Sequence, residues 1–320
     1  MATECTTAVT ESRFRAMASA VQLILVDPAP GAAEWARARI DELEGRWSRF
    51  VGDSELSRLV ANPGHDVQVS SDTLTLVATM VRAHLETAGR YDPTMLHQLL
   101  EAGYDTSIDQ PATGSGPTLR SVTVDRPDPE AGLHRVRMDP ARGTVWLPMG
   151  LGLDPGGIGK GLAADLVVAE LLQRGTRGAL VSIGGDLVAA GTAPTGGGWP
   201  VQIEDPTDTG ATLLELCIDG GAVATSSTLS RRWSHRGAVA HHVLDPSTGR
   251  VSKTDLATVT AVAPTGWQAE VQATAALVSG RREAFGVLEA AGCSGVVVTL
   301  DGTVETTADL SATAAWGSAP

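Results

Sequence analysis

Asp154-Pro155-Gly156-Gly157-Ile158-Gly159-Lys160-Gly161 is a glycine-dense loop that leads directly into an apolar helical segment from Leu162 to Val168. Glycines allow the main chain to approach a ligand closely, the start of a helix carries partial positive charge, and Lys160 adds a full one. This combination suits a diphosphate. A Walker loop would need Gly in place of Asp154 and Ser or Thr in place of Gly161, so ordinary P-loop chemistry is disfavoured. The alternative is a tight loop that only packs against a sheet.

A second segment, Ala269-Glu270-Val271-Gln272-Ala273-Thr274, is expected early in a helix. The i,i+4 spacing places the Glu270 carboxylate and the Thr274 hydroxyl on one face. Magnesium prefers such oxygen ligands and keeps positions for water and substrate phosphate, so the pair predicts a partial metal site. The alternative is a solvated Glu beside a Thr that faces its own helix.

The third segment is His241-His242-Val243-Leu244-Asp245-Pro246-Ser247-Thr248-Gly249, an alternating strand that enters a turn. Because side chains alternate along a strand, one His faces each side. A neutral imidazole near a phosphoryl group could accept a hydroxyl proton, and Asp245 could orient the turn or the ligand. A structural strand His and simple Asp-Pro turn chemistry are the alternatives.

The N-terminal half is expected to open with a strand over 20–26 and a helix over 33–50. A further helix is predicted from a cap at Ser71 or Asp72 through Thr87, with Gly89 as its C-terminal stop. Gly, Pro and Ser-rich stretches over 110–117 and 192–198 indicate exposed connections.

The C-terminal half alternates strands and helices. Helices are predicted over 157–173 and 267–278, strands over 179–183 and 257–263, and a hairpin over 296–306 around Asp301-Gly302. Several strands follow one another through turns too short for crossover helices, which disfavours a parallel doubly wound sheet. The mixture indicates an α+β or mixed α/β architecture.

Composition limits the kinds of partner. The formal charge is -13 over 320 residues, which disfavours non-specific nucleic-acid binding, and no stretch is apolar enough for membrane insertion. Without a secretory signal, we expect a cytoplasmic protein. The three cysteines, Cys5, Cys217 and Cys293, lack the spacing of a zinc site or a disulfide framework.

Together, the three segments closely resemble the ApbE family of FAD:protein FMN transferases, whose pattern includes Asp-x-Gly-Gly-Ile-x-Lys-Gly and His-x-x-Asp-Pro-x-x-Gly. Their order and spacing match, and the resemblance spans roughly residues 14 to 300. Further matching segments are Phe14-Arg15-Ala16-Met17, Phe50 with Ser54-Glu55-Leu56-Ser57-Arg58-Leu59, Gly89-Arg90-Tyr91-Asp92-Pro93-Thr94, Gly184-Gly185-Asp186 and Ala224-Thr225-Ser226.

The resemblance implies an α+β, two-lobed fold with mixed, largely antiparallel sheets flanked by helices, and a flavin cleft between the lobes. It implies one flavin transferase domain over 14–310, preceded by a flexible N-terminus (1–13) and followed by a flexible tail (311–320).

The site residues also follow from the resemblance. Glu270, Thr274 and the carbonyl of Gly157 would hold Mg2+, and His242 and Lys160 would be catalytic, with Asp186 or Asp245 in support. The residues expected to contact FAD are Met17, Phe50, Arg90, Tyr91, Asp92, Asp154, Lys160 and Leu244.

The implied reaction is Mg2+-dependent transfer of FMN from FAD to a Ser or Thr hydroxyl of an acceptor flavoprotein, with AMP as the second product. The chain departs from the family pattern at Glu270, usually Asp, at Ala18, usually Gly, and at Val60, usually Asn. These departures motivate two alternatives: a flavin carrier without transfer activity, and a Mg2+-dependent FAD pyrophosphatase.

Overall fold

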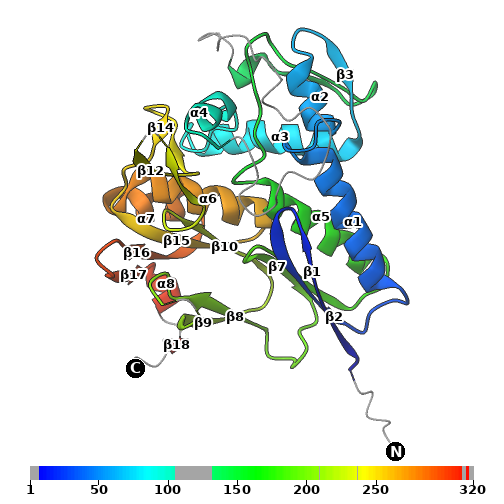
Figure 1. The fold of residues 1–320 in the computed structure, drawn as a ribbon. Coiled ribbons are helices and arrows are strands. Elements are labelled where there is room, and N and C mark those ends of the chain that lie inside the picture. Colours follow the sequence, from blue (N-terminus) through cyan, green and yellow to red (C-terminus); the bar gives the residue numbers. More distant parts are fainter. Residues whose placement is uncertain (1–6, 105–131, 209, 236, 312–314, 317–320) are drawn as a thin grey trace, which may run out of the picture.

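The central element of the fold is an eight-stranded sheet whose neighbouring strands all pair antiparallel (Figure 1). The computed structural model describes residues 7–104, 132–208, 210–235, 237–311 and 315–316, so the predicted connection over 110–117 lies outside the described residues. In sheet order the strands are β1 (Val9–Ala16), β2 (Ser19–Val26), β6 (Gly178–Ile183), β7 (Asp186–Gly191), β10 (Gly221–Ser227), β15 (Leu256–Ala263), β16 (Ser294–Thr299) and β17 (Val304–Thr306).

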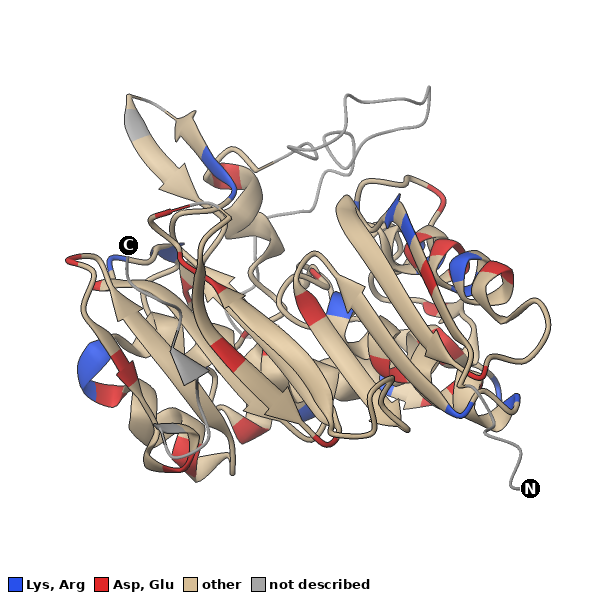
Figure 2. Cartoon of the chain, turned by 90° about the horizontal axis from the view of Figure 1, so that it is seen from below, with Lys and Arg blue, Asp and Glu red and all other residues tan. Residues whose placement is uncertain are grey.

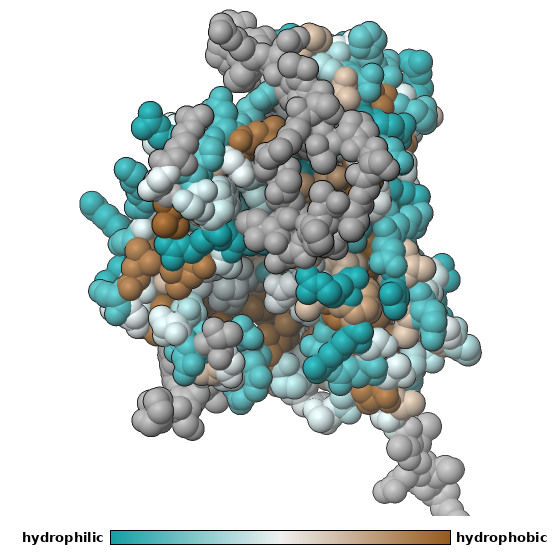
Figure 3. Space-filling model, viewed as in Figure 1, coloured by the Kyte–Doolittle hydropathy of each residue, from teal (hydrophilic) through white to brown (hydrophobic). Residues whose placement is uncertain are grey.

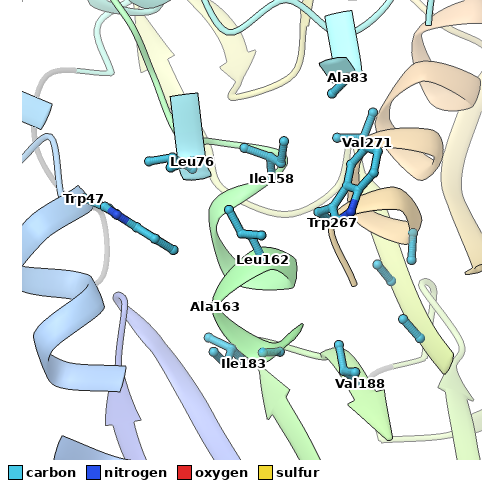
Figure 4. Close-up of a cluster of buried hydrophobic side chains, with 14 of the residues drawn as sticks. Trp47, Leu76, Ala83, Ile158, Leu162, Ala163, Ile183, Val188, Trp267 and Val271 are labelled. Atoms are coloured by element: carbon cyan, nitrogen blue, oxygen red, sulfur yellow. The ribbon is translucent and has the colours of Figure 1, made fainter. Parts of the chain in front are cut away.

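Helices cover one face of this sheet. α5 (Gly159–Gln173) packs on β6 and β7, and α6 (Gly266–Ser279) packs on β10 and β15. α1 (Ala32–Trp47) and α7 (Arg281–Ala290) flank this central pair. Figure 4 shows Ile158 and Leu162 at the start of α5 between the helices above and Ile183 of the sheet below, so the glycine loop is anchored in the core.

A second lobe lies above these helices in Figure 1. It contains α2 (Glu55–Ala61), α3 (Ser71–Glu86) and α4 (Leu96–Glu101), a 3-10 turn at Leu133–Arg135, and a small antiparallel sheet. That sheet has the order β3 (Asp66–Gln68), β5 (Thr144–Trp146) and β4 (Arg137–Asp139). The predicted α+β, two-lobed and largely antiparallel fold is confirmed.

The other face of the large sheet is covered by β8 (Trp199–Glu204) and β9 (Thr212–Ile218), with β18 (Ala315–Trp316) beside β9. Every second residue of β8 is buried, and Val201 and Ile203 pack in a core with Val223 and Val298 of the large sheet. The remaining elements are β11 (Arg232–His235), β12 (Ala238–His241), β13 (Leu244–Asp245), β14 (Arg250–Val251) and α8 (Ala308–Ser311).

The inner strands of the large sheet carry few charged residues, as Figure 2 shows from below. On the face in Figure 3, apolar residues form separate small groups among polar ones. None of the helices in the described ranges combines the length and apolar character needed to cross a bilayer.

Several predicted boundaries shift for physical reasons. Ser70, not Ser71 or Asp72, caps α3, because its hydroxyl accepts a hydrogen bond from the Thr73 amide at 3.3 Å. α5 begins at Gly159, two residues later than predicted, because Gly157 has a left-handed φ of 77°.

Both end segments that were expected to be flexible contain residues in strand pairs. β1 begins at Val9, within the segment expected to be flexible, because it pairs with β2 from Val9 to Ala16. In the expected C-terminal tail, Ala315 and Trp316 pair with β9.

Helices α5 and α6 cross at two glycines. A Cβ on Gly161 would lie 2.3 Å from the Gly266 carbonyl oxygen, and one on Gly266 would lie 2.4 Å from the Gly161 carbonyl oxygen. The crossing therefore fixes the glycine loop against the start of α6.

We expect Gly161→Ala to lower the free energy of unfolding by about 1–3 kcal/mol, because the added methyl meets backbone and not a movable side chain. Gly286→Ala in α7 is the matched control, since its Cβ would meet nothing within 4 Å. Its helix should gain roughly 0.5–1 kcal/mol. Urea denaturation distinguishes the two; equal stabilities would contradict the close crossing.

Candidate active site

One cleft of about 500 Å³ lies where the two lobes meet, and it is lined by every residue predicted to be catalytic, to contact FAD or to hold the metal, whereas Asp245 does not line it. The glycine loop and α6, which are about 110 residues apart in the chain, contribute Asp154, Gly157, Lys160, Glu270 and Thr274. The roles of these residues stay predictions, but the structure brings them together.

Lys160 lies between two carboxylates at the floor of the cleft. Its Nζ pairs with Asp186, at the start of β7, and lies 3.1 Å from Oε1 of Glu270. The other Glu270 oxygen accepts a hydrogen bond from the Gly161 amide at 2.8 Å. Both carboxylates are buried, and burial lowers the pKa of Lys160. One cation beside two anions leaves this floor net negative.

Two hydroxyl groups, one from α6 and one from β10, lie near the glycine loop. The Thr274 and Ser226 hydroxyls are 2.8 Å apart, and Thr274 also donates to the Glu270 carbonyl at 3.1 Å. A Cβ on Gly157 would lie 3.5 Å from Thr274 Oγ1, so the loop and the helix are in contact. Carboxylate and hydroxyl oxygens in a net negative site are the ligands that magnesium prefers, and they fit the predicted metal position.

The start of α6 is itself held by α5. The Asp165 carboxylate accepts hydrogen bonds from the Gly266 and Trp267 amides at 2.7 and 3.0 Å. Burial raises the pKa of Asp165 to about 6. This cap fixes the helix that carries Glu270 and Thr274, and we did not predict it from the sequence.

The opposite wall is aromatic and contains Phe50, Tyr104 and a buried arginine. The Arg49 guanidinium lies 4.2 Å from the Phe50 ring centroid and 4.6 Å from that of Tyr104. Its Nε lies 2.8 Å from an Asp154 oxygen, and Nη1 donates to the Tyr104 carbonyl at 3.0 Å. Phe50 and Asp154 are residues predicted from the sequence, whereas Arg49, which directly precedes Phe50, is not.

The remaining predicted contacts come from turns around the cleft. Met17, in the β1–β2 turn, has a positive φ of 51°, and Leu244 begins β13. Arg90, Tyr91 and Asp92 follow α3. Tyr91 is buried against Gly157, and burial together with the nearby Asp154, Glu270 and Asp92 carboxylates raises its pKa, so its hydroxyl is neutral.

His242 lines the cleft just after β12. Burial, and the nearby positive charge of Arg231, lower its pKa to about 3. The imidazole is therefore neutral at physiological pH and able to accept a proton. Its basicity would rise with an anionic ligand bound beside it.

We expect His242 to make stability fall in acid. The folded pKa is below the unfolded value of about 6.5, so the stabilisation is fully present above that pH and is lost as the pH falls toward 3. The melting temperature of His242→Gln should therefore fall less between pH 6.5 and pH 4 than that of the wild type. His65→Gln, at an exposed position, should follow the wild type. Parallel curves for all three proteins would contradict the assignment.

The Asp245 side chain stabilises the turn that follows it. Its carboxylate accepts from the Ser247 amide at 2.9 Å and from the Ser247 and Thr248 hydroxyls at 2.7 and 3.2 Å. The turn interpretation of Asp245 thus accounts for its contacts, and Asp186 is the carboxylate that pairs with Lys160.

The sequence profile of the ApbE family matches residues 1–315. The chain belongs to the ApbE family. The FAD:protein FMN transferase of Haemophilus influenzae is 28% identical over 269 residues, which cover 80% of this chain and 75% of that protein. The FAD:protein FMN transferase of Klebsiella pneumoniae is 29% identical over 299 residues, which cover 88% and 81%.

Solved ApbE structures share the fold. The ApbE protein from Thermotoga maritima superposes with a TM-score of 0.81 at 23% identity, and the match covers 96% of this chain and 99% of that one. The flavinyl transferase ApbE of Pseudomonas stutzeri gives a TM-score of 0.78 at 24% identity, with 99% and 100% covered. The family resemblance inferred from the motifs is confirmed.

Proposed function

We propose that this member of the ApbE family transfers FMN from FAD to a Ser or Thr hydroxyl of an acceptor protein, with AMP as leaving group. The observation that supports it most is the meeting of the glycine loop with α6, through Lys160, Glu270 and the Gly161 amide. Curated relatives named FAD:protein FMN transferase cover most of the chain. Phe50 lines the cleft and offers an aromatic ring to a flavin or an adenine ring, whereas Tyr104 already stacks on Trp233.

Magnesium fits this proposal because the floor of the cleft is net negative, while the substrate brings a diphosphate. Glu270, Thr274 and the Gly157 carbonyl would hold the ion. When bound, it supplies charge neutralisation at the phosphoryl oxygens. The carboxylate oxygens of Glu270 can accept it together with their present donors, since each oxygen has two lone pairs.

Phosphate binding and proton transfer are assigned to side chains of the protein. Lys160 places a fixed cation beside the diphosphate, whereas the Gly156, Gly159 and Gly161 amides already donate to Asp154, Pro155 and Glu270. The acceptor hydroxyl attacks the phosphorus attached to riboflavin, and neutral His242 takes its proton. The bond from this phosphorus to the bridging oxygen breaks, and AMP leaves with the electron pair.

Val60, Ala18 and Glu270 depart from the family pattern and motivated the alternatives of a flavin carrier and an FAD pyrophosphatase. Val60 of α2 is buried in the main hydrophobic core and does not line the cleft. Ala18 does line the cleft, and its φ is positive at 53°. Glu270 keeps its charge and is held by two donors. Because a carboxylate is retained at the proposed metal position, we favour transfer chemistry over simple flavin storage.

One experiment tests the proposed function against both alternatives. The protein is incubated with FAD, Mg2+ and a soluble acceptor flavoprotein, and the products are resolved by denaturing gel fluorescence and by chromatography. Fluorescence on the acceptor band with one AMP per flavin supports transfer. Free FMN and AMP would indicate a pyrophosphatase, and intact bound FAD would indicate a carrier; either result alone would refute transfer.

A further inference from the structure

Arg231 lies at the base of a hairpin, directly opposite His242. Within this hairpin, Arg232 of β11 pairs with His241 of β12, so the preceding and following residues face one another where the hairpin meets the cleft. Both Arg231 and His242 line the cleft. Figure 2 shows the hairpin projecting beyond the large sheet, so its base is the part that reaches the site.

The charges in the cleft show why this arginine differs from the others. Arg49 pairs with Asp154 at 2.8 Å, Lys160 pairs with Asp186 and Glu270, and Arg90 reaches Glu283 at 3.4 Å. Across the part of the chain that the structure describes, no carboxylate pairs with Arg231. Its positive charge is therefore available to a ligand.

The positive charge of Arg231 acts on His242, the proposed proton acceptor. Beyond the effect of burial, the Arg231 charge lowers the pKa of His242, which places the guanidinium within electrostatic reach of the imidazole. A protonated His242 beside the Arg231 guanidinium is unfavourable unless an anion joins them. An anionic ligand at the floor of the cleft would remove that repulsion.

The backbone at Arg231 is also unusual. Its φ is 47°, in the left-handed region that arginine rarely adopts. Such conformations cost free energy and persist where the surrounding structure fixes them, often at functional sites. The neighbouring Arg232 is in regular strand pairing, so the strain is confined to the residue that faces the cleft.

We propose that Arg231 is a catalytic residue that binds the diphosphate of the dinucleotide and neutralises the AMP phosphate as it leaves. This rests on the proposed function. When the acceptor oxygen bonds to the FMN phosphorus and the bridging P–O bond breaks, the electron pair remains on AMP and the hydroxyl proton passes to His242. The guanidinium offers two parallel donors to the developing phosphate charge.

The experiment compares Arg231→Gln, Arg231→Lys and the matched control Arg232→Gln, which removes the same charge at an exposed position of the same hairpin. We expect kcat/KM for FAD to fall by about 100-fold in Arg231→Gln, to recover partly in Arg231→Lys, and to stay within about twofold in Arg232→Gln. Thermal melting confirms that each variant is folded.

A binding measurement identifies what Arg231 recognises. By equilibrium titration in Mg2+, Arg231→Gln should bind ADP about tenfold more weakly and riboflavin as tightly as the wild type. Unchanged ADP affinity and unchanged turnover would overturn the assignment. If the wild type fails to modify any acceptor, the proposed function fails, and the ADP titration still decides whether Arg231 binds a diphosphate.

Discussion

Glu270→Ala and Thr274→Ala are each expected to reduce Mg2+-dependent flavinylation, with Glu270→Ala losing roughly a thousandfold. A bound metal contributes several kcal/mol to charge stabilisation in the transition state, and about 1.4 kcal/mol corresponds to tenfold in rate. Glu270 provides the only acidic side chain among the three proposed ligands. Single-turnover transfer to an acceptor, followed by gel fluorescence, measures the loss.

The geometry predicts which substitutions retain activity. Thr274→Ser keeps a hydroxyl beside Ser226 and should remain within about tenfold of the wild type, as should Glu270→Asp, which restores the residue that the family usually carries. Glu289→Ala removes an exposed carboxylate from α7 and serves as the charge control.

The magnesium dependence provides a second measurement. If Glu270 binds the ion, the Mg2+ concentration that gives half-maximal FAD affinity should rise at least tenfold in Glu270→Ala and not in Glu289→Ala. Full activity of Glu270→Ala with an unchanged magnesium requirement would exclude Glu270 as a ligand.

Much of the fold could be predicted because local patterns coincide with tertiary burial. β15 is an apolar run interrupted by Thr258 and Thr260 and is buried along nearly its whole length, and α3 has an apolar stripe between a serine cap and Gly89. The order of strands could not be predicted from such patterns. β2 pairs with β6 although about 150 residues separate them, and only packing decides that choice.

In the site too, residues within sequence motifs could be predicted, whereas residues whose role depends on tertiary contacts could not. The glycine loop and α6 carry recognisable motifs, so Lys160 and Glu270 could be named from the sequence. Arg49 and Arg231 have no motif of their own, because their importance comes from what surrounds them after folding. Arg49 gains its role from Asp154, about 100 residues further along the chain, and Arg231 from a hairpin register that places it opposite His242.

Lys160→Met is expected to affect stability and activity together. Lys160 pairs with both Asp186 and Glu270, whose side chains are each only 6% exposed. Removing one partner of a buried ion pair costs about 3–5 kcal/mol, because the remaining charges stay buried without compensation. Loss of the cation beside the diphosphate should also reduce transfer by roughly 100- to 1,000-fold.

The response of the melting temperature to Mg2+ distinguishes unpaired carboxylates in Lys160→Met from a general loss of packing. Without Lys160, the cleft floor holds two uncompensated carboxylates, so Mg2+ should raise the melting temperature of Lys160→Met more than that of the wild type. Lys253→Met, at an exposed position, should behave as the wild type in both measurements. A Lys160→Met protein as stable as the wild type would show that the two carboxylates need no cation; one destabilised but unresponsive to Mg2+ would place the metal elsewhere.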